Sequence, residues 1–516
     1  MKISRAANRL RCSRLNASLR RAPQRASATP ESSFAKQAIM VIHGIGEQRP
    51  MDTITAFVRA VWETDSGVCR NDKAFHAETW SKPDVRTGSL ELRRITTRES
   101  TKTTAFPRGV RSDFYELYWA DLSAGSTWNQ VQAWVAGLLF RNPITAVPRD
   151  VQLAWAGLWA ISLIIVVLLT ASVLPATATI FGVSVWRLWP FVWLARMQGW
   201  ALTATAAVLA VLAHKVAVPY AGRVVRYTRA SPDNISARKA IRERGLALLE
   251  ELHGKDYERI VVVGHSLGSI LAYDLINYFW ARRNAARTFV EATEDFAALK
   301  RLEETVARLD KHASGDAVSA FRQAQRTLSE RLRRRAKPKA NEADARWLIT
   351  DLITLGSPLT HADFLLATDA DELKTRIARR EFPTCPPVRE LLDTRDSIAK
   401  ARRAGLPLDD DRPQLMSFSF GLSRQRQLHH ACPFAVVSWT NIYDPARFVF
   451  CGDVISGPLT SRFGAGVRDV DLRELRGQSW RFSHTRYWTL SRTGAAGTQL
   501  KALREALDLT GLRLRR

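Results

Sequence analysis

The chain has 516 residues and a formal net charge of +26 at pH 7. It is too long for one ordinary core, which predicts a catalytic domain with large insertions or a chain of roughly two or three domains. The five cysteines are odd in number, scattered and without a C-x-x-C pair, which argues against a disulfide framework or zinc site and favours a reducing environment. The positive charge predicts attraction to nucleic acid or an acidic bilayer surface, without choosing between them.

Residues 1–36 form a basic segment rich in Arg, Ser and Ala, with no acidic residue before Glu31. The segment lacks the apolar stretch that a secretory signal needs. We therefore predict a disordered basic arm. The same composition is typical of mitochondrial transit peptides, which stay open as the alternative.

The next predicted elements are a strand, a glycine-rich loop and a helix. Residues 38–42 form a short apolar run that ends in His43-Gly44-Ile45-Gly46, and residues 52–63 then show helical spacing of apolar side chains. Further strands are expected near residues 75–80, 90–95 and 114–119.

Residues 151–218 carry the strongest membrane signal. No charged side chain occurs from residue 151 to 186, and a second charge-free stretch covers residues 197–213, with Arg187 and Pro190 interrupting the apolar segment between them. Because about 20 apolar residues cross a bilayer, we predict a transmembrane hairpin with two crossings. Lys and Arg are more numerous outside the hairpin than in its turn, which places both flanks in the cytoplasm. A buried helical hairpin in a soluble core is the alternative.

Downstream, apolar runs at residues 259–263, 351–356 and 434–439 alternate with helical stretches. Strands that are buried on both faces and separated by helices predict a doubly wound, mainly parallel α/β sheet. Residues 282–346 are charged and have helical spacing, which predicts an inserted helical arm; its basic end, residues 331–339, is a solvated face or a lipid or nucleic-acid contact. Proline-rich breaks within residues 360–432 predict a cap or lid.

The clearest chemical motif is Gly264-His265-Ser266-Leu267-Gly268, between an apolar strand and a helical run. This G-x-S-x-G context predicts a nucleophile elbow, in which small neighbours allow a strained turn that lifts the serine above the sheet. The N–H groups of Leu267 and Ile45 are the expected oxyanion donors, with Gly44 and Gly46 beside the latter. A phosphate-binding turn or a plain bend is the alternative for residues 43–46.

Several strings resemble one family: VIHGIGEQRP, FYELYWADL, VVVGHSLGSILAYDL, TLGSPL, HHACPFAVVSWTNIY, GDVISGP and SHTRYW. They are similar to bacterial lipase-like α/β hydrolases, whose elbow is related to those of DDHD-type phospholipases and GPI-inositol deacylases. The resemblance implies an α/β-hydrolase fold with Asp453 as the triad acid and His484 as the base, in the chain order Ser, Asp, His. Asp444 is a rival acid and His429 and His430 are rival bases, while His265 is expected to lie beside the site.

On this interpretation the chain divides into a hydrolase domain and three insertions. The hydrolase domain comprises residues 37–150, 219–281, 347–359 and 433–516, and the insertions are the hairpin 151–218, the arm 282–346 and the cap 360–432. The predicted function is a membrane-anchored serine esterase or lipase that needs no metal or cofactor. Its expected partners are the membrane and a lipid or other acyl-ester substrate, with no specific nucleic acid. An acyltransferase or thioesterase with the same triad, and a non-catalytic membrane scaffold, remain alternatives.

Overall fold

The computed structural model describes residues 34–44, 49–68, 78–84, 91–123, 232–339, 342–419, 424–446, 451–476, 482–491 and 494–512, with scattered residues between 140 and 228. Almost all of the predicted basic arm, residues 1–36, lies outside these ranges, as do Ile45 and Gly46. Among the described residues, no helix has the length and apolar character needed to span a bilayer. The predicted hairpin lies mostly outside the described residues and stays a prediction.

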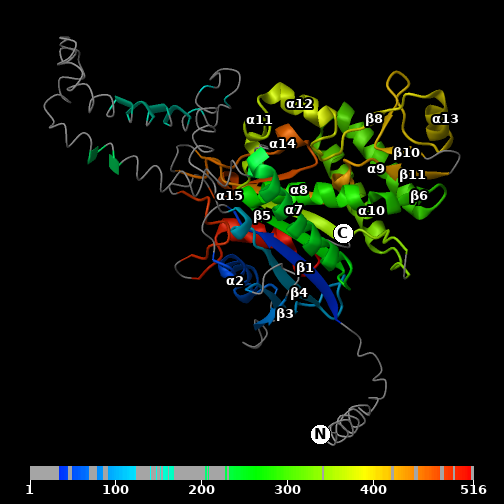
Figure 1. The fold of residues 1–516 in the computed structure, drawn as a ribbon. Coiled ribbons are helices and arrows are strands. Elements are labelled where there is room, and N and C mark those ends of the chain that lie inside the picture. The colour runs from blue at the N-terminus through cyan, green and yellow to red at the C-terminus, as the bar shows by residue number, and fades with distance from the viewer. Residues whose placement is uncertain are drawn as a thin grey trace, which may run out of the picture. The chain divides into compact units, whose positions relative to one another are not determined.

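A mixed, mainly parallel sheet of eight strands organises the fold (Figure 1). Its order is β13-β12-β7-β5-β1-β4-β3-β2; all neighbours from β13 to β4 are parallel, and β3 and β2 are antiparallel to their neighbours. This confirms the predicted mainly parallel α/β sheet. The strands are β1 (Ala35–Ile42), β2 (Thr79–Pro83), β3 (Arg93–Glu99), β4 (Val110–Leu117), β5 (Arg259–His265), β7 (Ile349–Leu355), β12 (Ser438–Tyr443) and β13 (Arg468–Asp471).

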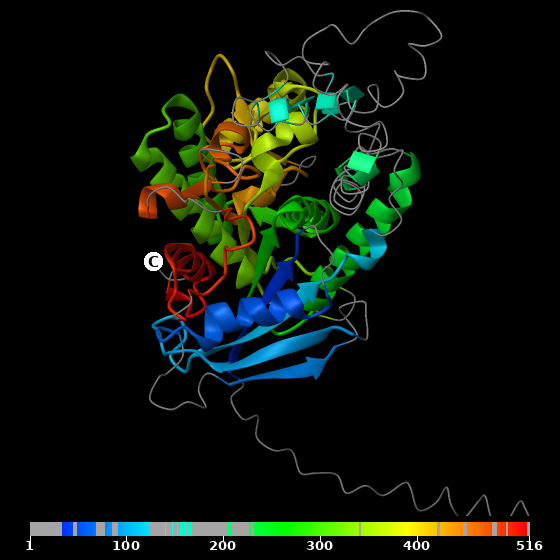
Figure 2. The ribbon, with the colours of Figure 1, turned by 90° about the vertical axis from the view of Figure 1, so that its left-hand side faces the viewer.

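The two central strands of the sheet, β5 and β1, have both faces covered. On one face of β1, Met40 and Ile42 join a core with the helices α7 (Pro232–His253) and α8 (Leu267–Arg283). On the other face, Ile39 and Val41 join a second core with α2 (Asp52–Val58) and α16 (Thr498–Leu507), which lie side by side in Figure 2. Alternate side chains of a strand point to opposite faces, so an unbroken apolar run is what such a strand requires.

The segment predicted as a helical arm contains two helices, α9 (Glu294–Lys311) and α10 (Gly315–Arg333). The side chains of Thr293 and Ser314 cap their N-termini. The apolar stripe Leu299, Leu302 and Val306 is fully buried and belongs to the main core. The helix α9 packs on α10, and α10 contacts β12 of the sheet.

The remaining elements are short. The helices are α11 (Ala362–Leu365), α12 (Ala370–Ala378), α13 (Arg395–Arg403), α14 (Thr460–Phe463) and α15 (Leu472–Arg476), and the minor strands are β6 (Thr288–Val290), β8 (Glu390–Leu391), β9 (Gln414–Leu415), β10 (Ser417–Ser419) and β11 (Gln425–Leu428). The strand predicted at residues 434–439 was misplaced: Pro433–Ala435 form a 3₁₀ turn, and the strand begins at Ser438. Proline has no N–H for a ladder, and the N–H groups of Val436 and Val437 donate back to Pro433 O.

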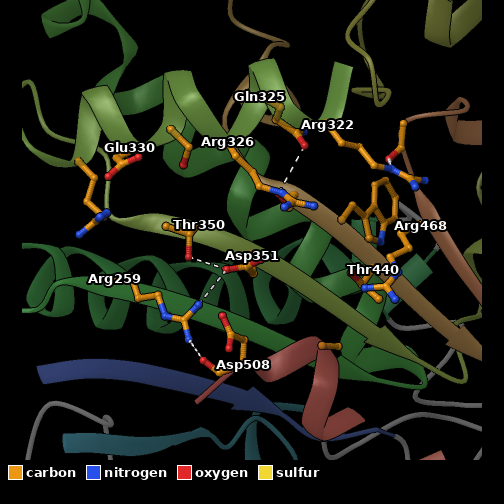
Figure 3. Close-up of a pocket in the computed structure, with 16 residues that line it drawn as sticks. Arg259, Arg322, Gln325, Arg326, Glu330, Thr350, Asp351, Thr440, Arg468 and Asp508 are labelled. Carbon is orange, nitrogen blue, oxygen red and sulfur yellow. Dashed lines mark hydrogen bonds and ion pairs between the residues drawn. The ribbon is translucent and has the colours of Figure 1, made fainter. Parts of the chain in front are cut away.

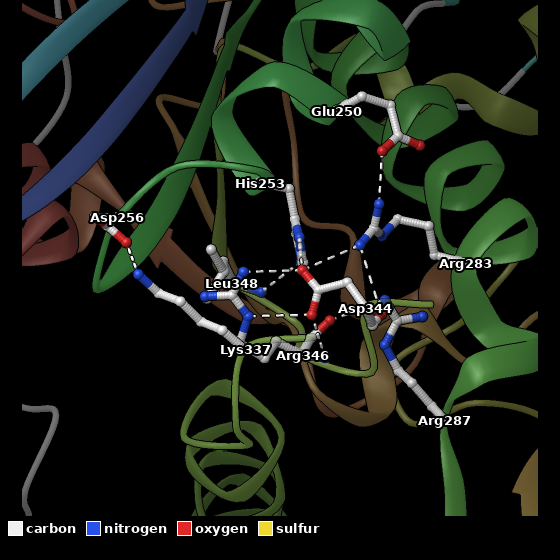
Figure 4. A network of polar contacts seen from close by, with 9 residues as sticks. All are labelled: Glu250, His253, Asp256, Arg283, Arg287, Lys337, Asp344, Arg346 and Leu348. Carbon is white, nitrogen blue, oxygen red and sulfur yellow. Dashed lines mark hydrogen bonds and ion pairs between the residues drawn. The ribbon is translucent and has the colours of Figure 1, made fainter. Parts of the chain in front are cut away.

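A buried ionic network fastens the chain after α10 to the helices beneath it (Figure 4). The Asp344 carboxylate lies 3.3 Å from His253 Nδ1, 3.3 Å from Arg283 and 3.0 Å from Arg346. Burial would raise the pKa of Asp344, but hydrogen bonds from His253 and Arg346 outweigh it and hold that pKa well below its usual range. The network thus joins α7, α8 and the segment that leads into β7.

Candidate active site

Ser266 occupies a strained turn between β5 and α8. Its φ and ψ are 52° and −129°, a conformation rare for any residue with a side chain. The turn is held by hydrogen bonds: Ser266 N–H donates to Leu355 O (2.9 Å), and Ser266 O accepts from the N–H (2.9 Å) and hydroxyl (2.6 Å) of Ser269. The sequence motif therefore forms the strand-turn-helix unit that a nucleophile elbow requires.

Three glycines give this turn its space. A Cβ on Gly264 would lie 2.6 Å from Ser269 Cα, one on Gly268 would lie 2.4 Å from His43 O, and one on Gly44 would lie 2.7 Å from Ser266 Cβ. Contacts this short with backbone atoms exclude any larger residue at the first two positions. Ile45 and Gly46 follow directly but lie outside the described residues, so the second predicted oxyanion donor is not located.

The structure brings Ser266, His484 and Asp453 together. His484 Nε2 lies 2.8 Å from Ser266 Oγ, and His484 Nδ1 lies 2.9 Å from Asp453 Oδ2. A carboxylate can only accept, so Nδ1 carries the proton, and Nε2 is left to accept the hydrogen bond from the serine hydroxyl. All three side chains are buried. This is the arrangement in which a histidine activates a serine.

Asp453 is fully buried and is held by more than the histidine. Tyr487 OH donates to Oδ2 (2.7 Å) and the N–H of Ile455 donates to Oδ1 (3.0 Å). Burial alone would raise the pKa of Asp453, but the hydrogen bonds from His484 and Tyr487 outweigh it and lower that pKa. The carboxylate is therefore ionised at neutral pH and able to balance a positive charge on His484.

The rival residues occupy other positions. Asp444 follows β12 directly, and its backbone oxygen accepts from Asp453 N–H (2.8 Å), while the carboxylate on Nδ1 of the base belongs to Asp453. His429 is buried with both ring nitrogens on backbone groups, Val388 O and Ala431 N–H, and burial lowers its pKa to about 4. The hydrogen bond to Ser266 Oγ is made by His484, and the carboxylate on His484 Nδ1 is that of Asp453.

His265 contacts both the backbone and the ring of His484. Its Nε2–H donates to the carbonyl oxygen of His484 (2.8 Å), and its ring lies 5.1 Å from the His484 ring and 4.9 Å from that of Trp488. Burial, reinforced by the neighbouring His484, lowers the pKa of His265 to about 3. His265 is thus a neutral side chain that fixes the His484 backbone, consistent with the expected place beside the site.

Gly356 is a site residue that sequence reasoning did not identify. It follows β7 with a φ of +58°, and a Cβ there would lie 2.7 Å from Tyr487, 2.9 Å from Asp453 Oδ2 and 3.1 Å from His484 Nδ1. Gly356 lies in the motif TLGSPL and Tyr487 lies in the motif SHTRYW. The sequence of either motif does not indicate that these two residues are in contact. Only the fold brings the two motifs together.

The loop after β1 is also organised by side chains. Trp119 N–H donates to His43 Nε2 (3.2 Å), the Trp119 ring N–H donates to His43 O (3.0 Å), and the two rings are stacked at 5.3 Å. His43 Nδ1–H in turn donates to Gly44 O (2.8 Å). These contacts hold the loop at His43 and Gly44, and Gly44 lies against Ser266.

All these residues gather at one edge of the sheet. Gly44 follows β1, Ser266 follows β5, Gly356 follows β7 and Asp453 comes after β12, so each lies beyond the carboxyl end of a parallel strand. The chain leaves β1 toward β4 on one side and continues with β5 and β7 on the other. Ser266 therefore lies where the strand order reverses, the usual binding position in open α/β sheets.

Among the described residues, no group of three or more His, Cys, Asp or Glu side chains could hold a metal ion. No protein-family model, curated protein or solved structure matches the chain. The resemblance of its motifs to lipase-like α/β hydrolases therefore stays a prediction.

Proposed function

We propose that the chain is a serine hydrolase of the α/β-hydrolase type that cleaves an acyl ester. The observation that carries the proposal is the continuous hydrogen-bonded series from Asp453 through His484 to Ser266, with steps of 2.9 and 2.8 Å. The strained elbow after β5 and the chain order Ser, Asp, His support the same assignment.

In the first half of the reaction, Ser266 Oγ attacks the acyl carbonyl carbon while its proton passes to His484 Nε2. The resulting imidazolium is balanced by the ionised Asp453. When the tetrahedral intermediate collapses, the bond to the alcohol oxygen breaks and His484 returns the proton to that oxygen. His484 Nε2 then removes a proton from water while the water oxygen attacks the acyl carbon of the acyl-serine. When this second intermediate collapses, the bond to Ser266 Oγ breaks and His484 returns the proton to Oγ, which releases the acid and restores the Ser266 hydroxyl.

The oxyanion of the intermediate needs N–H donors. Leu267 opens the 17-residue helix α8, and N–H groups in a first helical turn have no partner within the helix. The second donor in this proposal is Ile45 N–H, which follows the Gly44 carbonyl fixed by His43. Gly44 and Gly268 allow the loop after β1 to pack directly against the turn at Ser266, because a Cβ at either position would clash with it.

The proposal includes a membrane anchor. The charge-free stretches within residues 151–218 support two crossings, and the surrounding Lys and Arg support a catalytic domain on the cytoplasmic side. A domain anchored in this way meets lipid esters at the bilayer surface, so an acyl ester of a lipid is the proposed substrate.

The test uses full-length protein in detergent and in vesicles. Wild type should react with a fluorophosphonate probe and release fatty acid from lipid, whereas Ser266→Ala should lose labelling and about a millionfold in kcat. Ser461→Ala, a change of the same size at an exposed position on α14, should behave as wild type. Turnover by Ser266→Ala at the wild-type rate would overturn the proposal, and labelling without release of free acid would point to acyl transfer.

The anchor is tested separately. Extraction from membranes should require detergent, and both ends of the chain should be protected from protease in sealed right-side-out vesicles. Release by carbonate or high salt would mean that the positive charge, and not a hairpin, holds the chain to lipid.

A further inference from the structure

A pocket lined by arginine side chains lies at the amino ends of the parallel strands (Figure 3). Ser266 follows the carboxyl end of β5, so the pocket is at the opposite edge of the sheet. Its floor is made by the amino ends of β5, β7, β12 and β13, represented by Arg259, Asp351, Thr440 and Arg468. A seven-residue strand such as β5 is roughly 20 Å long, which separates this pocket from the triad by about that distance.

One face of α10 forms the roof. Positions at helical spacing line the pocket: Arg322, Gln325, Arg326, Ser329, Glu330 and Arg333. In Figure 3 the side chains of Arg322 and Arg326 extend from the helix toward the strand ends, while Arg259 and Asp351 pair at another part of the wall. The hydroxyl of Ser329 is buried in this wall without a hydrogen-bond partner among the described residues.

The charges of the lining do not cancel. It contains five guanidinium groups and three carboxylates. Asp351 is engaged by Arg259 and Thr350, and Glu330 is engaged by Arg334 outside the lining. Arg333 and Arg468 pair with Glu258 and Glu505, which lie outside the lining. Arg322 and Arg326 therefore have no carboxylate partner among the described residues.

These two arginines account for the surplus of positive charge. Among the described residues, Arg322 donates only to the carbonyl oxygens of Gly466 and Val467. Arg326 makes no hydrogen bond or ion pair with the described residues and is exposed at the pocket. Burial lowers the pKa of Arg322, and repulsion by Arg468 and Arg326 lowers it further, which places the three guanidinium groups within electrostatic range of one another.

We infer that this pocket binds a phosphate group, with Arg322 and Arg326 as its main charged donors and Arg468, which also pairs with Glu505 at 2.9 Å, as a third. A dianion between three guanidinium groups removes their mutual repulsion and accepts charge-assisted hydrogen bonds in the forked geometry that arginine offers. The Ser329 and Thr440 hydroxyls are further donors. The group belongs either to a soluble phosphate or to a lipid phosphomonoester, and the binding chemistry is the same for both.

The test measures binding of inorganic phosphate to the full-length protein in detergent by calorimetry, at a fixed ionic strength near 0.15 M. Wild type should bind saturably, and Arg326→Gln should weaken binding by about tenfold or more, the loss expected for one charge-assisted hydrogen bond. Arg326 is exposed and unpaired among the described residues, so its replacement should leave the fold intact. Ser266→Ala should bind phosphate as wild type does, which separates this site from the proposed hydrolase site.

Arg403→Gln is the matched control because it removes an equal charge from an exposed position at the end of α13. It should leave phosphate binding within about twofold of wild type. Competition by phosphatidic acid vesicles, and not by phosphatidylcholine vesicles, would identify a lipid as the source; competition by neither would identify a soluble phosphate. Absence of saturable binding, or an equal loss in Arg403→Gln and Arg326→Gln, would overturn the inference.

Discussion

Replacing Gly356 with alanine tests whether the triad geometry depends on one missing side chain. The new Cβ would lie 2.7 Å from Tyr487, 2.9 Å from Asp453 Oδ2 and 3.1 Å from His484 Nδ1, so it would push apart the acid and the base. The positive φ of +58° costs alanine about 1 to 2 kcal/mol, and overpacking adds about 1 to 3 kcal/mol. We expect a folded protein with a lower melting temperature.

The effect of Gly356→Ala on kcat should be larger than its effect on stability. A displacement of about 1 Å costs on the order of a hundredfold in rate, and loss of the orienting carboxylate costs about ten-thousandfold. Hydrolysis of a soluble ester and the rate of fluorophosphonate labelling measure this loss, and thermal unfolding measures the fold.

Gly494→Ala is the control for backbone strain. Gly494 also has a positive φ, +78°, but a Cβ there meets no heavy atom of the described residues within 4 Å. It should lose about 1 kcal/mol of stability and keep its kcat. If Gly356→Ala retained a kcat within a few-fold of wild type, the steric reasoning would be refuted.

Three further predictions follow from named contacts. Asp453→Asn should lower kcat by about ten-thousandfold while Asp444→Asn keeps it, because Asp453 holds Nδ1 of the base; the reverse ranking in ester hydrolysis would contradict the assignment. Burial raises the pKa of Glu116 from 4.5 to about 7, so the stability that Glu116 contributes is present below pH 4.5 and is lost as the pH rises through 7. In urea unfolding, Glu116→Gln should therefore be more stable than wild type by up to about 3 kcal/mol at pH 8 and equally stable at pH 4.5. An equal gain in stability at both pH values would exclude this titration. Asp344→Asn should lower the free energy of unfolding by about 3 kcal/mol in urea at pH 7 and leave kcat unchanged, because it leaves buried Arg and His side chains without their carboxylate. An unchanged urea midpoint would show that the network adds no stability.

The strained turn at Ser266 was predictable because its signal is local. The apolar run of β5, the two glycines and the helical spacing of α8 occur within 25 residues, from Arg259 to Arg283, and each feature has a direct steric or hydrogen-bonding reason. The same is true of the parallel sheet, since strands covered on both faces must be apolar throughout. Local patterns of this kind fixed the position of Ser266 to the residue.

The acid and the supporting residues depend on distant parts of the chain. Asp453 and Asp444 both follow β12, and the sequence around them does not state which one faces His484. That histidine lies 31 residues after Asp453. Gly356 acts on Tyr487 across the site, and no spacing rule connects them. The β12 boundary was missed for a smaller reason, since Pro433 begins a turn inside an otherwise apolar run.

The packing and hydrogen bonds of the site determine the protonation states of His265, Asp453 and His484. His265 is kept neutral by burial and donates its Nε2–H to the His484 backbone, so one imidazole is unavailable as a base and serves to fix the other. Hydrogen bonds from His484 and Tyr487 lower the pKa of Asp453 against the effect of burial and keep it ionised. Asp453 accepts the Nδ1–H of His484, so Nε2 has only its lone pair to offer Ser266. Removal of the serine proton then creates a single positive charge, next to the one buried carboxylate of the triad. A site organised in this way lowers the energy of the charged state before substrate arrives, which is the electrostatic condition for attack by a serine oxygen.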